Sequence, residues 1–194
     1  MKKIILIVSF LLCLPFMHIS AQAPYKTSVG GMISPVFSAG VSSKTFFADH
    51  VAFQVDLMTK GISTWYIRRG EFYMPNAVLD YSGYEQNTNI MYQKKIKDLK
   101  KSELFWFCGG GVSVGYVSAL HSTFGKLGAN AITGLEFVFN KTPLSIQIDL
   151  RPGYGLLYQF PRREGGGAKL RHFDWLVGFS LRYAFKGKAL DSVQ

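Results

Sequence analysis

The sequence predicts an all-β fold, an eight-stranded antiparallel up-and-down barrel, and three observations support this prediction. Apolar and polar residues alternate with a period of two along several stretches of the chain. Glycine (20 residues) and aromatic residues (15%) are abundant, whereas charged residues make up only 18%, which is typical of β-structure rather than of a helical bundle. The expected strands number eight, and an even number suits a single-chain barrel.

The clearest alternation lies near the C-terminal end, in residues 175–185. Trp175, Phe179 and Phe185 belong to a face of large apolar residues, and the residues between them are mostly small or charged. Residues 144–151 show the same period of two. The alternation recurs less cleanly in residues 129–139, 106–116, 51–58 and 37–44, and two weaker segments, 27–33 and 88–96, complete the eight expected strands.

The connections between the expected strands divide into short and long ones. The short connections are residues 48–50, 98–101 and 140–143, and the long ones are residues 61–87, 119–126 and 158–172. The first connection, around Pro35, is short where a long one is expected. Short turns at one end and long loops at the other are typical of outer-membrane barrels, with periplasmic turns and extracellular loops. This plan places both termini on the periplasmic side.

Residues 1–21 are predicted to be a cleaved signal peptide, followed by the barrel in residues 22–185. The chain begins with Lys2 and Lys3, continues with an apolar run, and reaches small and polar residues before Gln22. The apolar run is about 14 residues long, shorter than the roughly 20 that a membrane-spanning helix needs. Residues 186–194 are predicted to be a short periplasmic tail.

The polarity of the two strand faces bears on whether the barrel lies in water or in lipid. A soluble lipocalin-like barrel also alternates, but its apolar residues face inward around a ligand. In this chain the apolar half of each strand carries the large rings, and the polar half consists mainly of Gly, Ser and a single charge. This pattern favours an apolar face toward lipid and a narrow polar lumen. A soluble ligand-binding barrel is the alternative.

Six charged residues are expected to face inward, and they are Lys44, Asp56, Glu136, Asp149, Arg151 and Arg182. A buried charge is costly without a partner, and three acids with three bases can pair. An eight-stranded barrel is only wide enough for side chains to fill it. We therefore predict a structural network of ion pairs in the lumen. A narrow ion-conducting pore is the alternative.

Several strand motifs resemble the small outer-membrane β-barrel proteins common in Bacteroidetes. They are the Gly-rich aromatic strand 105–112, Gly-Leu-Glu-Phe at 134–137, the Pro-led strand 143–152 and the closing Ser-Leu-Arg-Tyr-Ala-Phe at 180–185. The resemblance covers most of the chain after the signal peptide and implies an OmpA-like or OmpX-like barrel with porin-family texture. The segment after Phe185 is too short for the peptidoglycan-binding domain that OmpA-type proteins append.

The long loops are the expected site of function, which we predict to be non-enzymatic: a structural or surface-interaction role. Arg162, Arg163, Lys169 and Arg171 are candidate contacts for lipopolysaccharide phosphates. The expected partners are outer-membrane lipid and a surface or envelope protein. Neither a cofactor, a metal site nor nucleic-acid binding is predicted.

Two further groups of residues leave alternatives open. His121 and His172 near the rim could serve an enzyme acting on lipid acyl chains, but no nucleophile, base and orienting group can be read from their spacing. The aromatic residues of the first long loop form either an adhesive surface or part of an aromatic girdle. The lysine-rich run 94–101 is predicted to be a solvated rim near lipid phosphate.

Overall fold

The computed structural model describes residues 23–35, 38–60, 64–68, 71–73, 81–119, 122–159 and 169–185. The expected signal peptide, residues 1–21, and the expected tail, residues 186–194, lie outside the described residues, which begin at Ala23. The barrel strands are β1 (Thr27–Ser34), β2 (Ser38–Ala48), β3 (Val51–Lys60), β6 (Tyr81–Asp98), β7 (Ser102–Ala119), β8 (Ser122–Phe139), β9 (Leu144–Gln159) and β10 (Lys169–Phe185). Two short strands, β4 (Thr64–Arg68) and β5 (Glu71–Tyr73), extend the same sheet.

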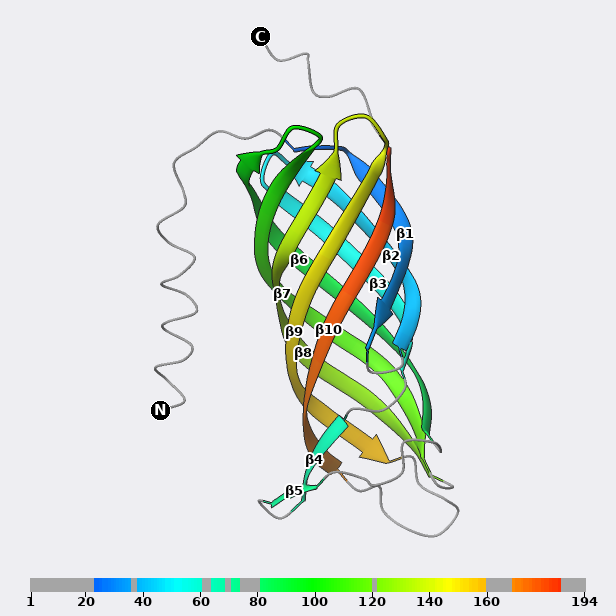
Figure 1. The fold of residues 1–194 in the computed structure, drawn as a ribbon. Helices are drawn as coiled ribbons and strands as arrows, with labels where there is room; N and C mark the ends of the chain where they lie inside the picture. The colour runs from blue at the N-terminus through cyan, green and yellow to red at the C-terminus, as the bar shows by residue number, and fades with distance from the viewer. Residues whose placement is uncertain are drawn as a thin grey trace, which may run out of the picture.

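The barrel closes because its first and last strands pair with each other. Every barrel strand lies antiparallel to its neighbour in the order β1-β2-β3-β6-β7-β8-β9-β10, and β10 then pairs with β1. In this closing pair Thr27 lies opposite Phe185, and Ile33 lies opposite Phe179. The predicted closed, eight-stranded antiparallel barrel is therefore confirmed (Figure 1).

The two ends of the barrel differ in how the strands are connected. The β2–β3, β6–β7 and β8–β9 turns lie at one end, together with the start of β1 and the end of β10 (top of Figure 1). We call this end the turn end. At the opposite end, which we call the loop end, strands β1, β3, β7 and β9 end and strands β2, β6, β8 and β10 begin.

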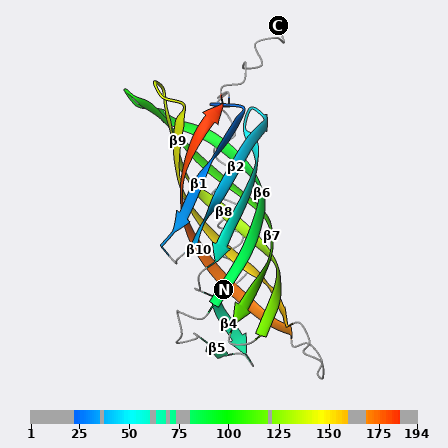
Figure 2. The same cartoon turned by 90° about the vertical axis from the view of Figure 1, so that its right-hand side faces the viewer.

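The wall is taller on one side than on the other, as Figure 2 shows. Strands β6 to β10 contain 16 to 18 residues each, whereas β1, β2 and β3 contain 8, 11 and 10. At the loop end β10 therefore extends past the end of β1. There β4 pairs with β10 instead, from Thr64 opposite Asp174 to Ile67 opposite Arg171.

The predicted long loops were wrong in their bounds, because the strands continue into them. Strand β6 begins at Tyr81 rather than near residue 88, and β8 begins at Ser122, so that residues 122–126 belong to a strand. Strands β9 and β10 likewise extend to Gln159 and from Lys169. These extensions continue the backbone ladder, but they lack a run of apolar residues on one face. A period-two search for apolar residues consequently ends too early.

Candidate functional site: the charged lumen

The barrel has an apolar exterior and a polar interior. On β10 the alternate residues Trp175, Phe179 and Tyr183 are exposed, whereas Ser180 and Arg182 between them are buried. The other barrel strands show the same arrangement, with apolar side chains outside and polar side chains inside. Other exposed apolar side chains are Val29, Val41, Phe53, Ile90, Val112, Val114, Leu127, Leu135, Ile146, Ile148, Leu150 and Leu156. We call this outer surface the apolar belt.

Aromatic rings border the apolar belt at two heights. Tyr84, Tyr116, Tyr154, Tyr158 and Trp175 are exposed toward the loop end, and Phe47, Phe53, Tyr183 and Phe185 are exposed toward the turn end. Trp175 and Tyr183 are eight residues apart on β10, about 27 Å along the strand and about 21 Å along the axis at a tilt of ~40°. Two such rings around a band of this height match the aromatic girdles of membrane barrels.

At the turn end the lumen is filled by apolar and aromatic side chains. The residues of this cluster are Tyr25, Phe46, Ala52, Met91, Phe105, Phe107, Ile132, Val138 and Ala184. Tyr25 precedes β1, and its side chain is buried in the lumen. Its ring packs edge-on against Phe46, with the ring centroids 5.3 Å apart. Sequence analysis missed Tyr25, because a single ring before a strand carries no periodic signal.

The first charged layer lies on the loop-end side of this cluster, around Lys44 and Glu136. The Lys44 ammonium lies 2.7 Å from Glu136 Oε2, and both side chains are completely buried. Gln93 Nε2 donates to the same oxygen at 3.0 Å, and Tyr25 donates to Oε1 at 2.7 Å. Lys44 also lies 4.9 Å from the centroid of the Phe107 ring, a distance at which a cation is attracted to the ring face. Glu136 therefore has hydrogen-bond partners on both carboxylate oxygens.

Arg182 continues the network from Glu136 to two glutamines. Its guanidinium lies 4.0 Å from Glu136 Oε1 and donates to Gln54 Oε1 at 3.3 Å. It also donates to Gln147 Oε1. Sequence analysis did not single out these two glutamines, but each stands two residues before a predicted inward-facing acid. The period of two therefore carried a signal that could have found them.

The second charged layer is a clamp of two acids on Arg151. Arg151 donates through Nε to Asp149 Oδ1 at 2.5 Å and through Nη2 to Asp149 Oδ2 at 3.1 Å, and it also pairs with Asp56. Gln54 Nε2 donates to Asp56 at 2.9 and 3.0 Å, and Gln147 Nε2 donates to Asp149 at 2.8 Å. The structure thus brings all six predicted lumen charges into one network of ion pairs and hydrogen bonds.

A third charged layer near the loop end was not anticipated. The Lys126 ammonium lies 2.6 Å from Glu85 Oε2 and 2.5 Å from Asp174 Oδ2, and all three residues are buried. Sequence analysis placed Glu85 in the loop 61–87 and Lys126 in the loop 119–126, and it left Asp174 just before the expected last strand. All three residues lie on the extended parts of β6, β8 and β10, and their side chains point into the lumen.

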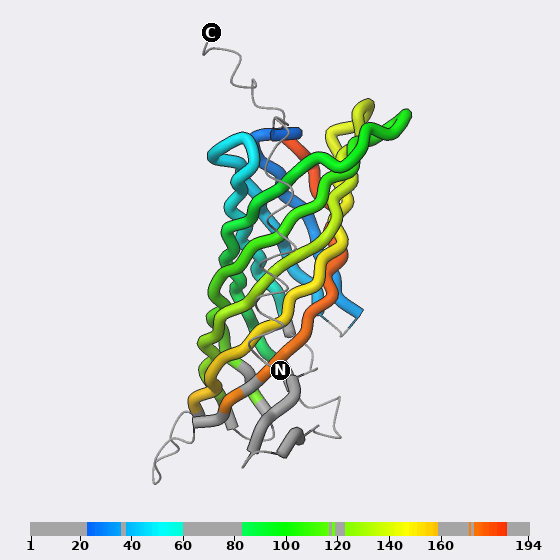
Figure 3. The backbone as a smooth tube through the Cα atoms, turned by 90° about the vertical axis from the view of Figure 1, so that its left-hand side faces the viewer, coloured from blue at the N-terminus to red at the C-terminus, as the bar shows by residue number. Residues whose placement is uncertain are grey.

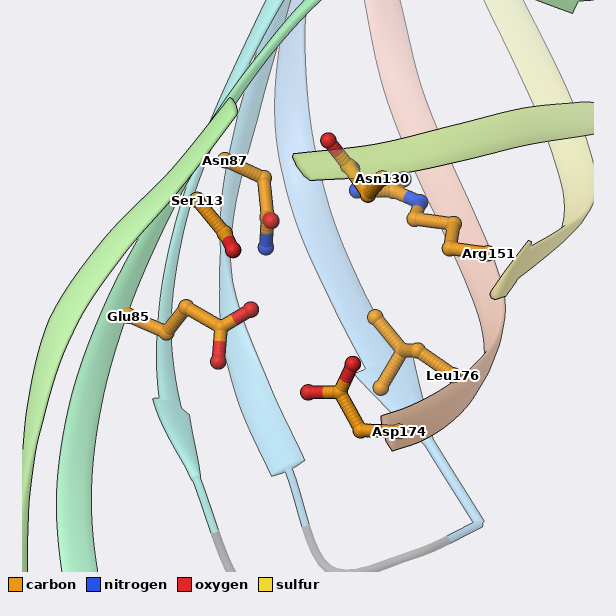
Figure 4. A pocket seen from close by; sticks show the side chains of 7 residues that line it. All are labelled: Glu85, Asn87, Ser113, Asn130, Arg151, Asp174 and Leu176. Atoms are coloured by element: carbon orange, nitrogen blue, oxygen red, sulfur yellow. The ribbon is translucent and has the colours of Figure 1, made fainter. Parts of the chain in front are cut away.

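The space between the second and third layers is small. A cavity of about 10 Å³ lies there, with Glu85, Asp174 and Arg151 around it (Figure 4). This is about the space that one water molecule needs. Met32, Met58 and Leu176 form a buried apolar cluster at the loop-end side of the lumen. Side chains therefore fill the described lumen in successive layers.

The structure describes only some of the residues that were predicted to lie in loops. His121, Arg162 and Arg163 lie outside the described residues. The backbones of Lys169 and His172 belong to β10, and Arg171 is exposed at the loop end. From the aromatic loop, Trp65 and Tyr66 lie in β4, and Phe72 and Tyr73 lie in β5.

Sequence analysis placed Tyr84 among the aromatic residues of the first long loop, 61–87. Of those residues, Tyr84 is the one whose side chain the structure describes. It is exposed on the outside of β6, and its ring centroid lies 6.4 Å from that of Tyr116 on β7. Tyr84 consequently belongs to the loop-end ring of aromatic residues.

Within the described ranges, no helix is long and apolar enough to cross a membrane. The same residues include no group of three or more His, Cys, Asp or Glu side chains that could hold a metal ion.

Fold and lumen together define a closed, side-chain-filled β-barrel with an apolar exterior. No protein-family model and no curated protein matches the chain. Among solved structures, the chain is similar to Neisserial surface protein A (NspA), with 13% identity and a TM-score of 0.45 over 82% of this chain and 94% of that one. It is also similar to Ail, the attachment invasion locus protein of Yersinia pestis, with 12% identity and a TM-score of 0.31 over 84% of this chain and 99% of that one.

Proposed function

We propose that this chain is an integral outer-membrane protein, a filled and non-conducting barrel that supports an interaction surface at its loop end. The observation that carries this proposal is the reversed polarity of the wall. Large apolar side chains encircle the outside, while charged and amide side chains are buried inside. Soluble monomers rarely expose a contiguous apolar surface of more than a few hundred Å², whereas a bilayer requires one.

The backbone supports the same environment. In lipid every peptide N–H and C=O group needs a partner within the protein, and a closed barrel is one of two structures that provide this. Pairing of β1 with β10, from Thr27 opposite Phe185 to Ile33 opposite Phe179, gives the described wall such closure over the turn-end part of the apolar belt. The fold and the belt are therefore consistent with each other.

The soluble ligand-binding alternative fits these features poorly. A lipocalin-like barrel needs an apolar interior with room for a ligand. Here Lys44, Asp56 and Arg182 occupy the interior, and the space beside the Arg151 layer is about 10 Å³. A narrow pore is disfavoured for the same reason, since ions cross a barrel through continuous water and these layers leave room for about one molecule.

The loop end is the side on which we place surface interactions. The β4–β5 hairpin extends the sheet beyond the barrel there, and Arg171 is exposed on the neighbouring part of β10. Contact of Arg162, Arg163, Lys169 and Arg171 with lipopolysaccharide phosphates belongs to this proposal. The enzymatic alternative has no specific observation in its favour, because His121 and the side chain of His172 lie outside the described part of the chain.

Fluorescence quenching by brominated lipids tests membrane insertion directly. Trp106 and Trp175 lie on outward-facing positions of the wall. A Trp65→Phe variant limits the signal to these two residues, and its fluorescence should be strongly quenched when the acyl chains carry bromine. Unchanged fluorescence in a folded barrel would contradict insertion. Stable single-channel steps in planar bilayers would contradict the non-conducting part of the proposal.

A further inference from the structure

Two turns project side by side at the turn end of the barrel, as Figure 3 shows for the β6–β7 and β8–β9 hairpins. The backbone N–H of Leu99 donates to the carbonyl of Ser102 at 2.8 Å, which closes the first turn tightly. The N–H of Asn140 donates to the carbonyl of Lys101 at 3.1 Å and joins the second turn to the first. The two turns therefore present one continuous surface.

That surface carries an excess of positive charge. Lys97, Lys100, Lys101 and Lys141 are all exposed, and we call these four residues the basic turn patch. The two acids of the same segments are already engaged, because Lys95 lies 2.9 Å from Asp98 and 3.3 Å from Glu103. Lys95 and these two acids together carry a net charge of −1, so with the four lysines of the patch (+4) the two turns keep a net charge of +3.

Exposed apolar side chains stand among these lysines. Ile96 is 56% exposed and Leu99 is 37% exposed. The β6–β7 register shifts between Lys95 and Lys97, which leaves Ile96 without an opposite residue. Such a bulge re-aims a side chain and increases the local twist of the strand. Basic and apolar residues side by side are suited to the interface of a bilayer, where phosphates and acyl chains meet.

The patch also lies at a suitable height. Lys101 is five residues from the outward-facing Trp106, about 17 Å along the strand and about 13 Å along the axis at a tilt of ~40°. The apolar belt therefore ends before the patch begins. If the belt occupies the hydrocarbon core, the lysines reach the phosphate groups of the adjacent leaflet.

We propose that the basic turn patch binds the phosphate groups of anionic phospholipid in the leaflet at the turn end, with Ile96 and Leu99 inserted among the upper acyl chains. This inference rests on the proposed membrane insertion and adds a lipid preference to it. A cell-wall polymer or an acidic protein would also attract the lysines, but the exposed Ile96 and Leu99 favour lipid. The lumen does not add to this positive charge, since three acids balance three bases among the predicted lumen residues and Lys126 faces two further acids, Glu85 and Asp174.

The test compares lipid retention by the full-length protein in nanodiscs that contain phosphatidylcholine and phosphatidylglycerol. Native mass spectrometry of the released protein gives the ratio of the two bound lipids. Wild type should be enriched in phosphatidylglycerol, and Lys97→Gln with Lys101→Gln should reduce that enrichment by about five-fold for each lysine removed. The matched control for this turn-end variant, Lys97→Arg with Lys101→Arg, keeps both positive charges and should leave the enrichment unchanged.

Each other outcome counts against the inference. Equal enrichment in wild type and in the turn-end variant would overturn it, and so would an equal loss in both double variants. Competition by inorganic phosphate, beyond that of chloride at the same ionic strength, would assign the patch to free phosphate. Binding to sedimented cell wall that the turn-end variant loses, without a lipid preference, would assign it to the wall. Insertion into pure phosphatidylcholine checks the proposed function separately, and failure to insert would overturn both.

Discussion

The Tyr25 hydroxyl donates a hydrogen bond of 2.7 Å to Glu136, and this contact joins residues that are 111 positions apart in the chain. Through it the segment that precedes β1 is attached to the charged network of the lumen. Because Tyr25 is only 4% exposed, its ring also closes the turn end of the lumen against Phe46. The wall and its filling are thus stabilised by the same residue.

Replacing Tyr25 should separate the hydrogen bond from the packing of the ring. Tyr25→Phe removes the hydroxyl and should lower the free energy of unfolding by about 1–2 kcal/mol. Tyr25→Ala also removes the ring and should cost about 3–5 kcal/mol. Urea unfolding in lipid vesicles measures both values. Tyr183→Phe on the exposed face is the control, and a loss as large as that of Tyr25→Phe would argue against the role of the buried hydroxyl.

Lys44 and Glu136 should be energetically coupled, because each is completely buried. Either Lys44→Met or Glu136→Gln leaves a buried charge with fewer partners and should cost about 3–5 kcal/mol. The double variant should cost much less than the sum of the two. A double-mutant cycle from equilibrium unfolding gives the coupling energy. Additive losses would show that the two charges act independently of each other.

In the third charged layer, removal of Lys126 should lower the free energy of unfolding more than removal of Glu85. Lys126→Met leaves the carboxylates of Glu85 and Asp174 buried without the ammonium that lies within 2.6 Å of both. This variant should lose about 3–5 kcal/mol of unfolding free energy. Glu85→Gln keeps one ion pair and should lose about 1–2 kcal/mol. Equal losses, measured by the same unfolding assay, would contradict this arrangement.

Neighbouring strands approach closely at three glycines of β7, Gly109, Gly111 and Gly115, and the approach is tightest at Gly111. A Cβ atom on Gly111 would stand 1.9 Å from the carbonyl oxygen of Thr88 on β6, so Gly111→Ala forces the backbones apart. We expect this variant to refold poorly, with loss of the heat-resistant, fast-migrating band on gels. Gly31→Ala is the matched control, since its nearest contact would be an ordinary 3.9 Å. Equal refolding yields for the two variants would contradict the close approach.

The period of two carried most of the information that the sequence held about this molecule. It indicated the eight strands and the inward positions of Lys44 and Arg182, because one buried face repeats along each strand. It did not indicate which charges pair, since pairing depends on the register between strands far apart in the chain. Lys126 and Glu85 were placed in loops, because polar residues occupy both strand faces beyond the apolar belt.

The short length of β1 has a consequence for the order in which the barrel strands pair during folding. Strand β10 makes 15 register pairs with β9 but only seven with β1. The β1 pairs also join distant residues, such as Thr27 and Phe185, so forming them requires ordering nearly the whole chain between them. We therefore expect this seam to close last when the protein folds. Under mechanical load the β1–β10 pair should separate first, while the seven pairs between consecutive barrel strands stay intact.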